Sequence, residues 1–131
     1  MTLVIIEGYD RPEYFRRVAD DEANRCRHCF ELRLSKTADL AREKGFDAFS
    51  SSLLISPHQQ HDLVREVGES LSGDIEFAYA DLRKRYSDSR RMTKGLDLYR
   101  QQYCGCIFSE WERYTEKLQA PNSKSQTNSN L

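Results

Sequence analysis

The stretch FELRLSKTADLAREKGFDAFSSSLLISP, residues 30–57, decides the fold because a helical pattern runs directly into a strand pattern. Its first half repeats apolar residues at spacings of four, four and three, which is typical of a helix with one buried face. These residues are Phe30, Leu34, Ala38 and Ala41. Gly45 is placed to end this helix, and residues 46–56 predict a strand running into a loop that Pro57 keeps from continuing.

Outward from this stretch, strand-like and helical segments alternate along the chain. Residues Thr2 to Ile6 are rich in β-branched side chains and predict a buried strand, and residues 75–82 predict another. Helices are expected over residues 10–22, 58–71, 92–102 and 107–118. This alternation predicts an α/β fold with a small, largely parallel sheet flanked by helices. Three strands are few for a parallel sheet, which is usually covered on both faces.

Composition and length limit the class of protein. A chain of 131 residues is long enough for one domain, which we expect over residues 1–118, with residues 119–131 as a disordered tail that lacks apolar periodicity. The net charge is −1, so no global charge indicates a nucleic-acid or membrane partner. No apolar run is long enough to cross a bilayer, and no secretion signal is evident at Met1. The sequence therefore predicts a cytoplasmic protein without a membrane partner.

Four cysteines in a reducing compartment indicate metal binding or catalysis more than a structural disulfide framework. Cys26 and Cys29 form a C-x-x-C motif at the start of the long helix, where free amides favour thiolates. They can be two small buried residues, ligands of a zinc site completed by the other two cysteines, or ligands of an iron–sulfur cluster. His28, between them, can be a ligand or a proton donor, and the simpler expectation is that it faces solvent. His58 and His61 are expected at the surface.

Cys104 and Cys106 are separated by one glycine near the end of the chain. A disulfide across one residue strains the backbone, and Gly105 relieves that strain by allowing unusual backbone angles. Strained disulfides are the labile kind, so the spacing suits a reversible two-electron switch. A glycine turn between two ordinary thiols is the simpler alternative.

Basic residues cluster between Asp81 and Arg100, where seven Lys or Arg and three Asp give a local charge of +4. Such a patch can hold phosphates, and nearby tyrosines can stack on unpaired bases. A solvated helix face is the alternative. The candidate RNA-binding residues are Arg83, Lys84, Arg85, Arg90 and Arg91.

Three motifs together resemble the QueH-type epoxyqueuosine reductases. They are RCRHCFELRLSKTADLAREKGFDAFSSSLLISP from Arg25, DLRKRYSDS from Asp81 and LYRQQYCGCIFS from Leu98. The resemblance runs in order from about Glu7 to Glu110, and the combined pattern is far more specific than either cysteine pair. It implies an adenine-nucleotide α-hydrolase-like (HUP-type) fold and an oxidoreductase that reduces epoxyqueuosine at the tRNA wobble position to queuosine, the last step of queuosine biosynthesis.

The same resemblance assigns roles to the cysteines. Cys26 and Cys29 match two ligands of the family's [4Fe–4S] cluster, and Cys104 and Cys106 match its redox-active pair. The basic segment would hold the tRNA anticodon arm, and an electron donor of unknown identity is required. Family members begin with a strand ending in adjacent cysteines, which this chain does not contain. Relative to the family we therefore expect a chain truncated at its N-terminus: the start is mis-called, the chain is a natural truncation, or a second polypeptide supplies the missing half. We expect the chain by itself to hold a cluster poorly or not at all, and truncation can impair its activity.

Two further hypotheses use the same cysteines differently. A zinc-stabilised, non-catalytic RNA-binding module would use all four as ligands, and it would be colourless and contain zinc, whereas a cluster protein is brown and contains iron. A metal-free thiol–disulfide oxidoreductase ranks last, because its C-x-x-C does not directly follow a first strand.

Overall fold

The computed structural model describes residues 1–8 and 10–119, which divide into two compact units at the boundary between Tyr86 and Ser87. The expected disordered tail lies outside the described residues apart from Gln119, which belongs to the last helix. The expected single domain over residues 1–118 stays a prediction.

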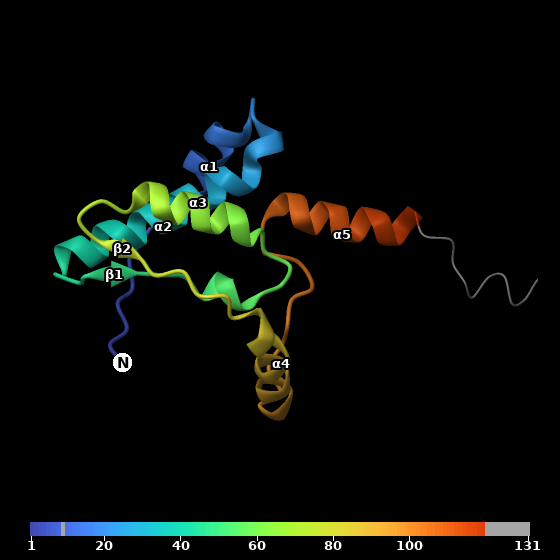
Figure 1. Cartoon of the computed structure of the whole chain (residues 1–131). Coiled ribbons are helices and arrows are strands. Elements are labelled where there is room, and N and C mark those ends of the chain that lie inside the picture. The colour runs from blue at the N-terminus through green and yellow to red at the C-terminus, as the bar shows by residue number, and fades with distance from the viewer. Residues whose placement is uncertain (9, 120–131) are drawn as a thin grey trace, which may run out of the picture. The chain divides into compact units, whose positions relative to one another are not determined.

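The first unit is built around one parallel strand pair joined through a helix (Figure 1). Its elements are α1 (Arg11–Val18), α2 (Arg25–Glu43), β1 (Ala48–Phe49), α3 (His61–Leu71) and β2 (Glu76–Phe77), with 3-10 turns at Glu22–Asn24, Ser52–Ile55 and Arg83–Arg85. Parallel strands need such a crossover, which α3 supplies here. The register pairs Ala48 with Glu76 and Phe49 with Phe77. The small parallel sheet confirms the α/β class, and the relation to the HUP-type fold stays a prediction.

The core lies between the sheet and the two helices α2 and α3, which pack side by side (Figure 1). The four periodic residues of α2 are all buried, as their spacing predicts. They meet Val64 and Val67 of α3, and the rings of Phe49 and Phe77 complete the cluster with centroids 5.2 Å apart. In the described part of the chain the opposite face of the sheet, which carries Ala48 and Glu76, is exposed.

Gly45 ends α2 as predicted. Its φ of +74° is a left-handed conformation that glycine adopts without strain, and the amide of Phe46 then donates to the carbonyl of Ala41 at 2.8 Å. The chain can therefore reverse within two residues and enter β1. This turn delivers Ser50 and Ser51 to the carboxyl end of the sheet.

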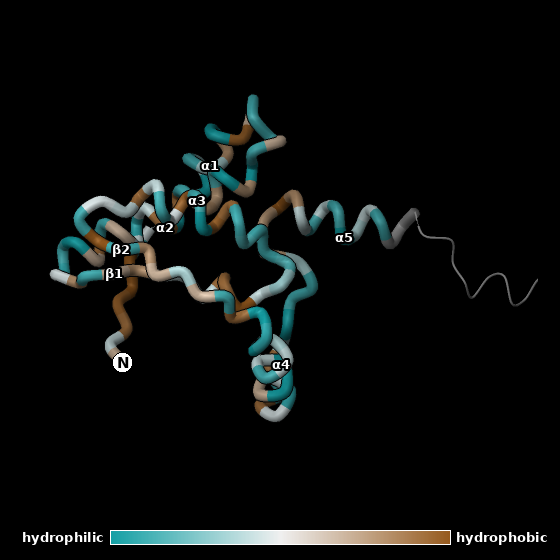
Figure 2. Tube along the Cα trace, viewed as in Figure 1, coloured by the Kyte–Doolittle hydropathy of each residue, from teal (hydrophilic) through white to brown (hydrophobic). Residues whose placement is uncertain are grey.

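The predicted strand Thr2–Ile6 is wrong. These residues have no strand pairing in the described chain, and Leu3 and Ile5 are 78% and 77% exposed. β-branched composition favours a strand but does not form one without a neighbouring strand to pair with. Figure 2 shows this N-terminal segment as a hydrophobic stretch.

The second unit contains α4 (Tyr86–Gly95), which begins at the unit boundary, and α5 (Ile107–Gln119). The predicted helix over residues 92–102 is wrong in its bounds, because α4 starts earlier and ends at Gly95. Two residues later, Asp97 adopts a φ of +51°, which is not helical. The last helix is confirmed over Ile107–Leu118. No helix of the described residues is long and apolar enough to span a membrane.

Candidate functional site

The C-x-x-C motif lies in the first turns of α2, as predicted. Cys26 and Cys29 are three residues apart on this helix and therefore share one face. Both are thiols and both are half-buried, and Cys26 packs against the hydrophobic core. Arg27 donates to Glu66 Oε1 of α3 at 2.9 Å, which holds this turn against the neighbouring helix. The pair thus sits on a packed helix start rather than on a loose loop.

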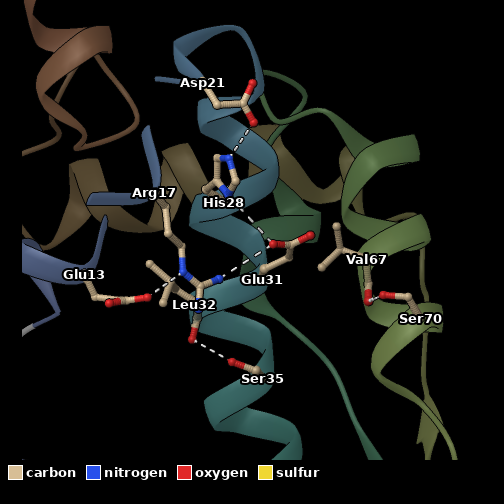
Figure 3. Close-up of polar contacts among 9 residues, drawn as sticks. All are labelled: Glu13, Arg17, Asp21, His28, Glu31, Leu32, Ser35, Val67 and Ser70. Carbon is tan, nitrogen blue, oxygen red and sulfur yellow. Dashed lines mark hydrogen bonds and ion pairs between the residues drawn. The ribbon is translucent and has the colours of Figure 1, made fainter. Parts of the chain in front are cut away.

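His28, between the two cysteines, does not face solvent as predicted. Its side chain is 19% exposed, and its Nε2 lies 2.8 Å from Asp21 Oδ2, ahead of the helix. Figure 3 shows the ring between Asp21 and Glu31, whose Oε2 lies 3.9 Å from Nδ1. Arg17 of α1 lies 3.7 Å from the same carboxylate of Glu31. A chain of charged groups therefore connects α1 to the C-x-x-C turn.

Asp21 responds to these contacts. The hydrogen bond from His28, reinforced by one from the Asn24 side chain at 2.8 Å, lowers the pKa of the Asp21 carboxyl. The two hydrogen bonds favour the ionised carboxylate and link Asp21 to the beginning of α2. The signal in the sequence was Asp21 seven residues before His28, a spacing that no simple helical rule picks out.

Thiolates are suitable ligands for soft metal ions and for iron–sulfur clusters, so the C-x-x-C pair fits such a group in chemistry. It does not fit in number, because these groups take four protein ligands. No group of three or more His, Cys, Asp or Glu side chains within residues 1–8 and 10–119 is arranged to hold a metal ion. The pair amounts to half of the number that such a set requires.

The C-G-C motif lies just before α5 in the second unit, and its glycine behaves as predicted. Gly105 has a φ of +96°, and a Cβ there would lie 3.0 Å from Gln101 Nε2. The turn brings the two sulfur atoms of Cys104 and Cys106 to 3.7 Å, with both residues as thiols. A disulfide has an S–S length of about 2.0 Å, so the two sulfurs are close neighbours that are not bonded.

Ser109, in the first turn of α5, contacts both sulfurs. Its Oγ lies 3.1 Å from Cys104 Sγ and 3.4 Å from Cys106 Sγ, and its amide donates to Cys106 Sγ at 3.3 Å. The sequence analysis missed this residue. The available signal was the spacing, because Ser109 lies three positions after Cys106, which precedes a helix. The amide of a helix's third residue is one that donates to the side chain of an N-cap residue.

The two thiols are not equivalent. Partial burial would raise the pKa of Cys106, but hydrogen bonds with the hydroxyl and amide of Ser109, with Cys104 and with the amide of Phe108 outweigh it and lower that pKa below its ordinary value. Cys104 is exposed, whereas Cys106 is half-buried. Cys106 is therefore the better-stabilised thiolate and Cys104 the more accessible sulfur.

The five candidate RNA-binding residues fall in two short elements. Arg83, Lys84 and Arg85 form the 3-10 turn after β2, and Arg90 and Arg91 lie on α4. All five are exposed. Arg83 binds Asp81 through a 2.6 Å contact that lowers the pKa of that carboxyl, and Arg91 pairs with Asp88. Part of the positive charge is thus already compensated.

His61 is the buried residue that the sequence analysis placed at the surface. It is 6% exposed at the start of α3, where Nε2 donates to the Ser56 carbonyl at 2.9 Å. Its Nδ1 lies 3.2 Å from the Tyr79 hydroxyl, just beyond β2. His61 therefore fastens the loop after β1 to the chain after β2, at the carboxyl end of the parallel sheet where α/β proteins bind their ligands.

Comparison with known proteins decides the family. A family model described as epoxyqueuosine reductase QueH matches residues 1–112. The chain belongs to the epoxyqueuosine reductase QueH family. This confirms the resemblance seen in the three motifs, each of which lies within the matched residues.

Curated QueH relatives give the same result. A protein of Dehalococcoides mccartyi named epoxyqueuosine reductase QueH is 52% identical over 123 residues, which cover 92% of this chain and 65% of that relative. Namesakes from Streptococcus pyogenes and Thermotoga maritima are 41% and 36% identical over 74% and 70% of this chain. The chain spans 42% and 50% of the length of these two relatives. The hypothesis of a zinc-stabilised RNA-binding module gains no support from these relatives.

Proposed function

We propose that this chain takes part in reducing epoxyqueuosine to queuosine at the wobble position of tRNA, with Cys104 and Cys106 as its redox-active pair. The observation that carries the proposal is the pair of thiols 3.7 Å apart in a chain of the QueH family. Its relatives bear the name epoxyqueuosine reductase, which specifies the substrate and the reaction class.

The pair matches the reaction in electrons and protons. Removing the epoxide oxygen as water takes up two electrons and two protons. Two thiols release two electrons and two protons when they form a disulfide, so one closure of the pair balances one reduction. Because the exposed Cys104 presents a sulfur to solvent, the oxidised pair can afterwards be reopened by an external reductant.

Cys26 and Cys29 are proposed as two ligands of a [4Fe–4S] cluster. Such a cluster would supply one-electron transfer when bound. The residues themselves contribute a packed helix start whose amides favour thiolates, and His28 and Asp21 hold the turn that leads into it. The reaction also requires an electron donor, whose identity this proposal does not specify. A tRNA substrate suits an enzyme of the bacterial cytoplasm.

The basic residues are proposed to bind the anticodon arm of the substrate tRNA. Their support is exposure and local charge, since all five side chains are exposed in a segment of net charge +4. Phosphate contacts of this kind position a nucleic acid without reading its sequence. Selection of the wobble nucleotide would then depend on the reactive site.

The test is a comparison of queuosine formation by the chain and by its cysteine variants. The gene is expressed in a bacterial strain that makes epoxyqueuosine but lacks its own reductase, and nucleosides of the tRNA are quantified by mass spectrometry. We expect queuosine with the natural chain and at least about a hundredfold less with Cys104→Ser or Cys106→Ser. Ser87→Ala, in the first turn of α4, serves as the control. Undiminished queuosine in both cysteine variants would overturn the redox role.

A further inference from the structure

The contacts of Ser109 distinguish the two sulfurs more sharply than exposure alone. Cys106 precedes α5, and its carbonyl accepts the amide of Glu110 at 3.0 Å, which makes it the N-cap residue. Its sulfur takes the place of the usual capping oxygen and accepts the Ser109 amide at 3.3 Å. Within the described residues, no backbone amide donates to the sulfur of Cys104 in this way. The helix-start amide therefore stabilises negative charge on Cys106 and not on Cys104.

The hydroxyl of Ser109 can follow the charge state of Cys106. With both cysteines as thiols, the hydroxyl donates to the Cys106 carbonyl at 2.9 Å and accepts from both sulfurs, at 3.1 Å from Cys104 and 3.4 Å from Cys106. A hydroxyl hydrogen rotates to suit its partners, so loss of the thiol proton lets it turn and donate to the sulfur at the same 3.4 Å separation. The hydroxyl thus becomes a further donor to Cys106, beside the backbone amides of Phe108 and Ser109, when the thiolate forms.

We propose that Ser109 fixes the order in which the two sulfurs react: an incoming thiol attacks Cys104 of the oxidised pair, and Cys106 leaves as the thiolate that Ser109 holds. This rests on the proposed function in so far as that function oxidises the pair. Ser109 is a catalytic residue in this step because it touches both reacting atoms. The reductant it implies is a thiol that reaches an exposed sulfur, either a small molecule or the thiol of another protein.

The exchange balances in two steps. The first thiolate forms a bond to Cys104 Sγ while the bond between the two cysteines breaks, and the electron pair stays on Cys106 Sγ. A second thiolate then bonds to the sulfur of the first, which releases Cys104, and the two cysteines take up the two protons. One disulfide and two external thiols become one dithiol and one external disulfide. The direction follows from the leaving group, since the sulfur with the better-stabilised thiolate leaves faster.

The experiment maps where an incoming thiol lands. The purified chain is oxidised with diamide, exposed briefly to glutathione, and quenched with an alkylating reagent in acid. Trypsin cuts after Arg100 and Arg113, so one peptide carries both cysteines, and fragmentation at Gly105 shows which one holds glutathione. We expect glutathione on Cys104 and the alkyl group on Cys106 in at least about tenfold excess over the reverse arrangement.

Variants separate the role of Ser109 from a general effect on the helix. Ser109→Ala is expected to reduce the excess to about threefold or less, because the hydroxyl donor is lost while the amide remains. Ser109→Thr, which keeps the hydroxyl, should restore it, and Ser87→Ala should leave it unchanged. Glutathione on Cys106, an even distribution in the natural chain, or an oxidised pair that never forms would each overturn the proposal.

A second readout follows the thiolate itself. In the Cys104→Ser background, Ser109→Ala should move the pH midpoint of thiolate absorbance at Cys106 upward. For each pH unit of that shift, alkylation at neutral pH should slow by about threefold, since a tenfold loss of thiolate is partly offset by its greater nucleophilicity. Neither measurement needs tRNA. A chain that fails to make queuosine but keeps this asymmetry would lose the proposed function and retain the inference.

Discussion

Gly68 of α3 lies against the ring of Phe77 on β2, so closely that a methyl group on Gly68 would overlap the ring. Phe77 is 6% exposed and packs on Phe49, so the ring cannot move aside freely. We expect Gly68→Ala to lower the free energy of unfolding by about 1–3 kcal/mol, measured by urea denaturation. Gly73→Ala is the control, because a methyl there meets only Arg42 Nη2 at 4.0 Å. Equal losses in both variants would contradict the close packing.

His61 forms hydrogen bonds to the segments that follow β1 and β2 at the carboxyl end of the sheet, so removing these hydrogen bonds should destabilise that end of the sheet. Tyr79→Phe removes one hydrogen bond and is expected to cost about 0.5–1.5 kcal/mol. His61→Phe also removes the 2.9 Å hydrogen bond to the Ser56 carbonyl, which then keeps only the longer one from the Gln59 amide at 3.4 Å, and is expected to cost more, about 1–3 kcal/mol. Hydrogen exchange should show faster exchange over residues 51–60 in both variants. Unchanged exchange in this segment would show that His61 does not hold it.

Asp74 should make stability depend on pH in the acid range. Arg42 donates to Asp74 Oδ1 at 2.7 Å, and this hydrogen bond lowers the pKa of the Asp74 carboxyl. A carboxyl with a lowered folded-state pKa stabilises the fold above its unfolded value of about 3.9, and that contribution is lost as the pH falls through the lower folded value. The melting temperature of Asp74→Asn should therefore fall less than that of the natural chain between about pH 5 and pH 2.

The comparison needs a carboxylate that lacks this partner. Glu43, exposed at the end of α2, provides it, and Glu43→Gln should follow the natural chain through the same titration. Parallel melting profiles for the natural chain and Asp74→Asn would contradict the role given to the Arg42 contact.

The sequence predicted the features that depend on neighbours along the chain. The periodic residues of α2, its end at Gly45 and the left-handed Gly105 are all local, and all are confirmed. Contacts between distant residues were not predictable in this way. The burial of His61 depends on Tyr79, eighteen residues later, and the position of His28 depends on a turn outside its own helix.

The strand expected over Thr2–Ile6 shows that a local pattern can also predict an element that does not form. Its apolar, β-branched residues satisfy the local rule, yet strand formation is a property of a pair of segments. The two strands that do form are short, and each supplies one buried phenylalanine to the core. Family membership was accessible from sequence because it depends on the combination of three motifs rather than on any contact.

The C-x-x-C pair should bind iron weakly by itself. Two thiolates are half of the set that a [4Fe–4S] cluster takes, and no third ligand joins them within the described residues. After anaerobic reconstitution of the isolated chain and desalting, we expect clearly less than one cluster per chain by iron and sulfide analysis. Cys26→Ser and Cys29→Ser should remove the iron that remains. A stable, stoichiometric cluster in the natural chain would contradict this prediction.

Binding of tRNA should depend most on the basic residues whose charge is least compensated by a neighbouring carboxylate. Arg83 and Arg91 are paired with Asp81 and Asp88, so Lys84 and Arg90 contribute the less compensated charges. Neutralising both with glutamine should weaken tRNA binding and lower the slope of log affinity against log salt concentration by about one for each phosphate that the variant no longer binds. Filter binding across a salt series measures both quantities.

Single glutamine variants at other basic residues show whether the loss of tRNA binding is specific to the segment around Lys84 and Arg90. Lys44→Gln removes one positive charge from the exposed end of α2 and should leave the salt slope unchanged. Arg83→Gln should have a smaller effect than Lys84→Gln, because the Arg83 charge is already partly neutralised by Asp81 at 2.6 Å. If Lys44→Gln weakens binding as much as Lys84→Gln, the attraction is a general effect of net charge and the segment around Lys84 and Arg90 is not the tRNA-binding surface.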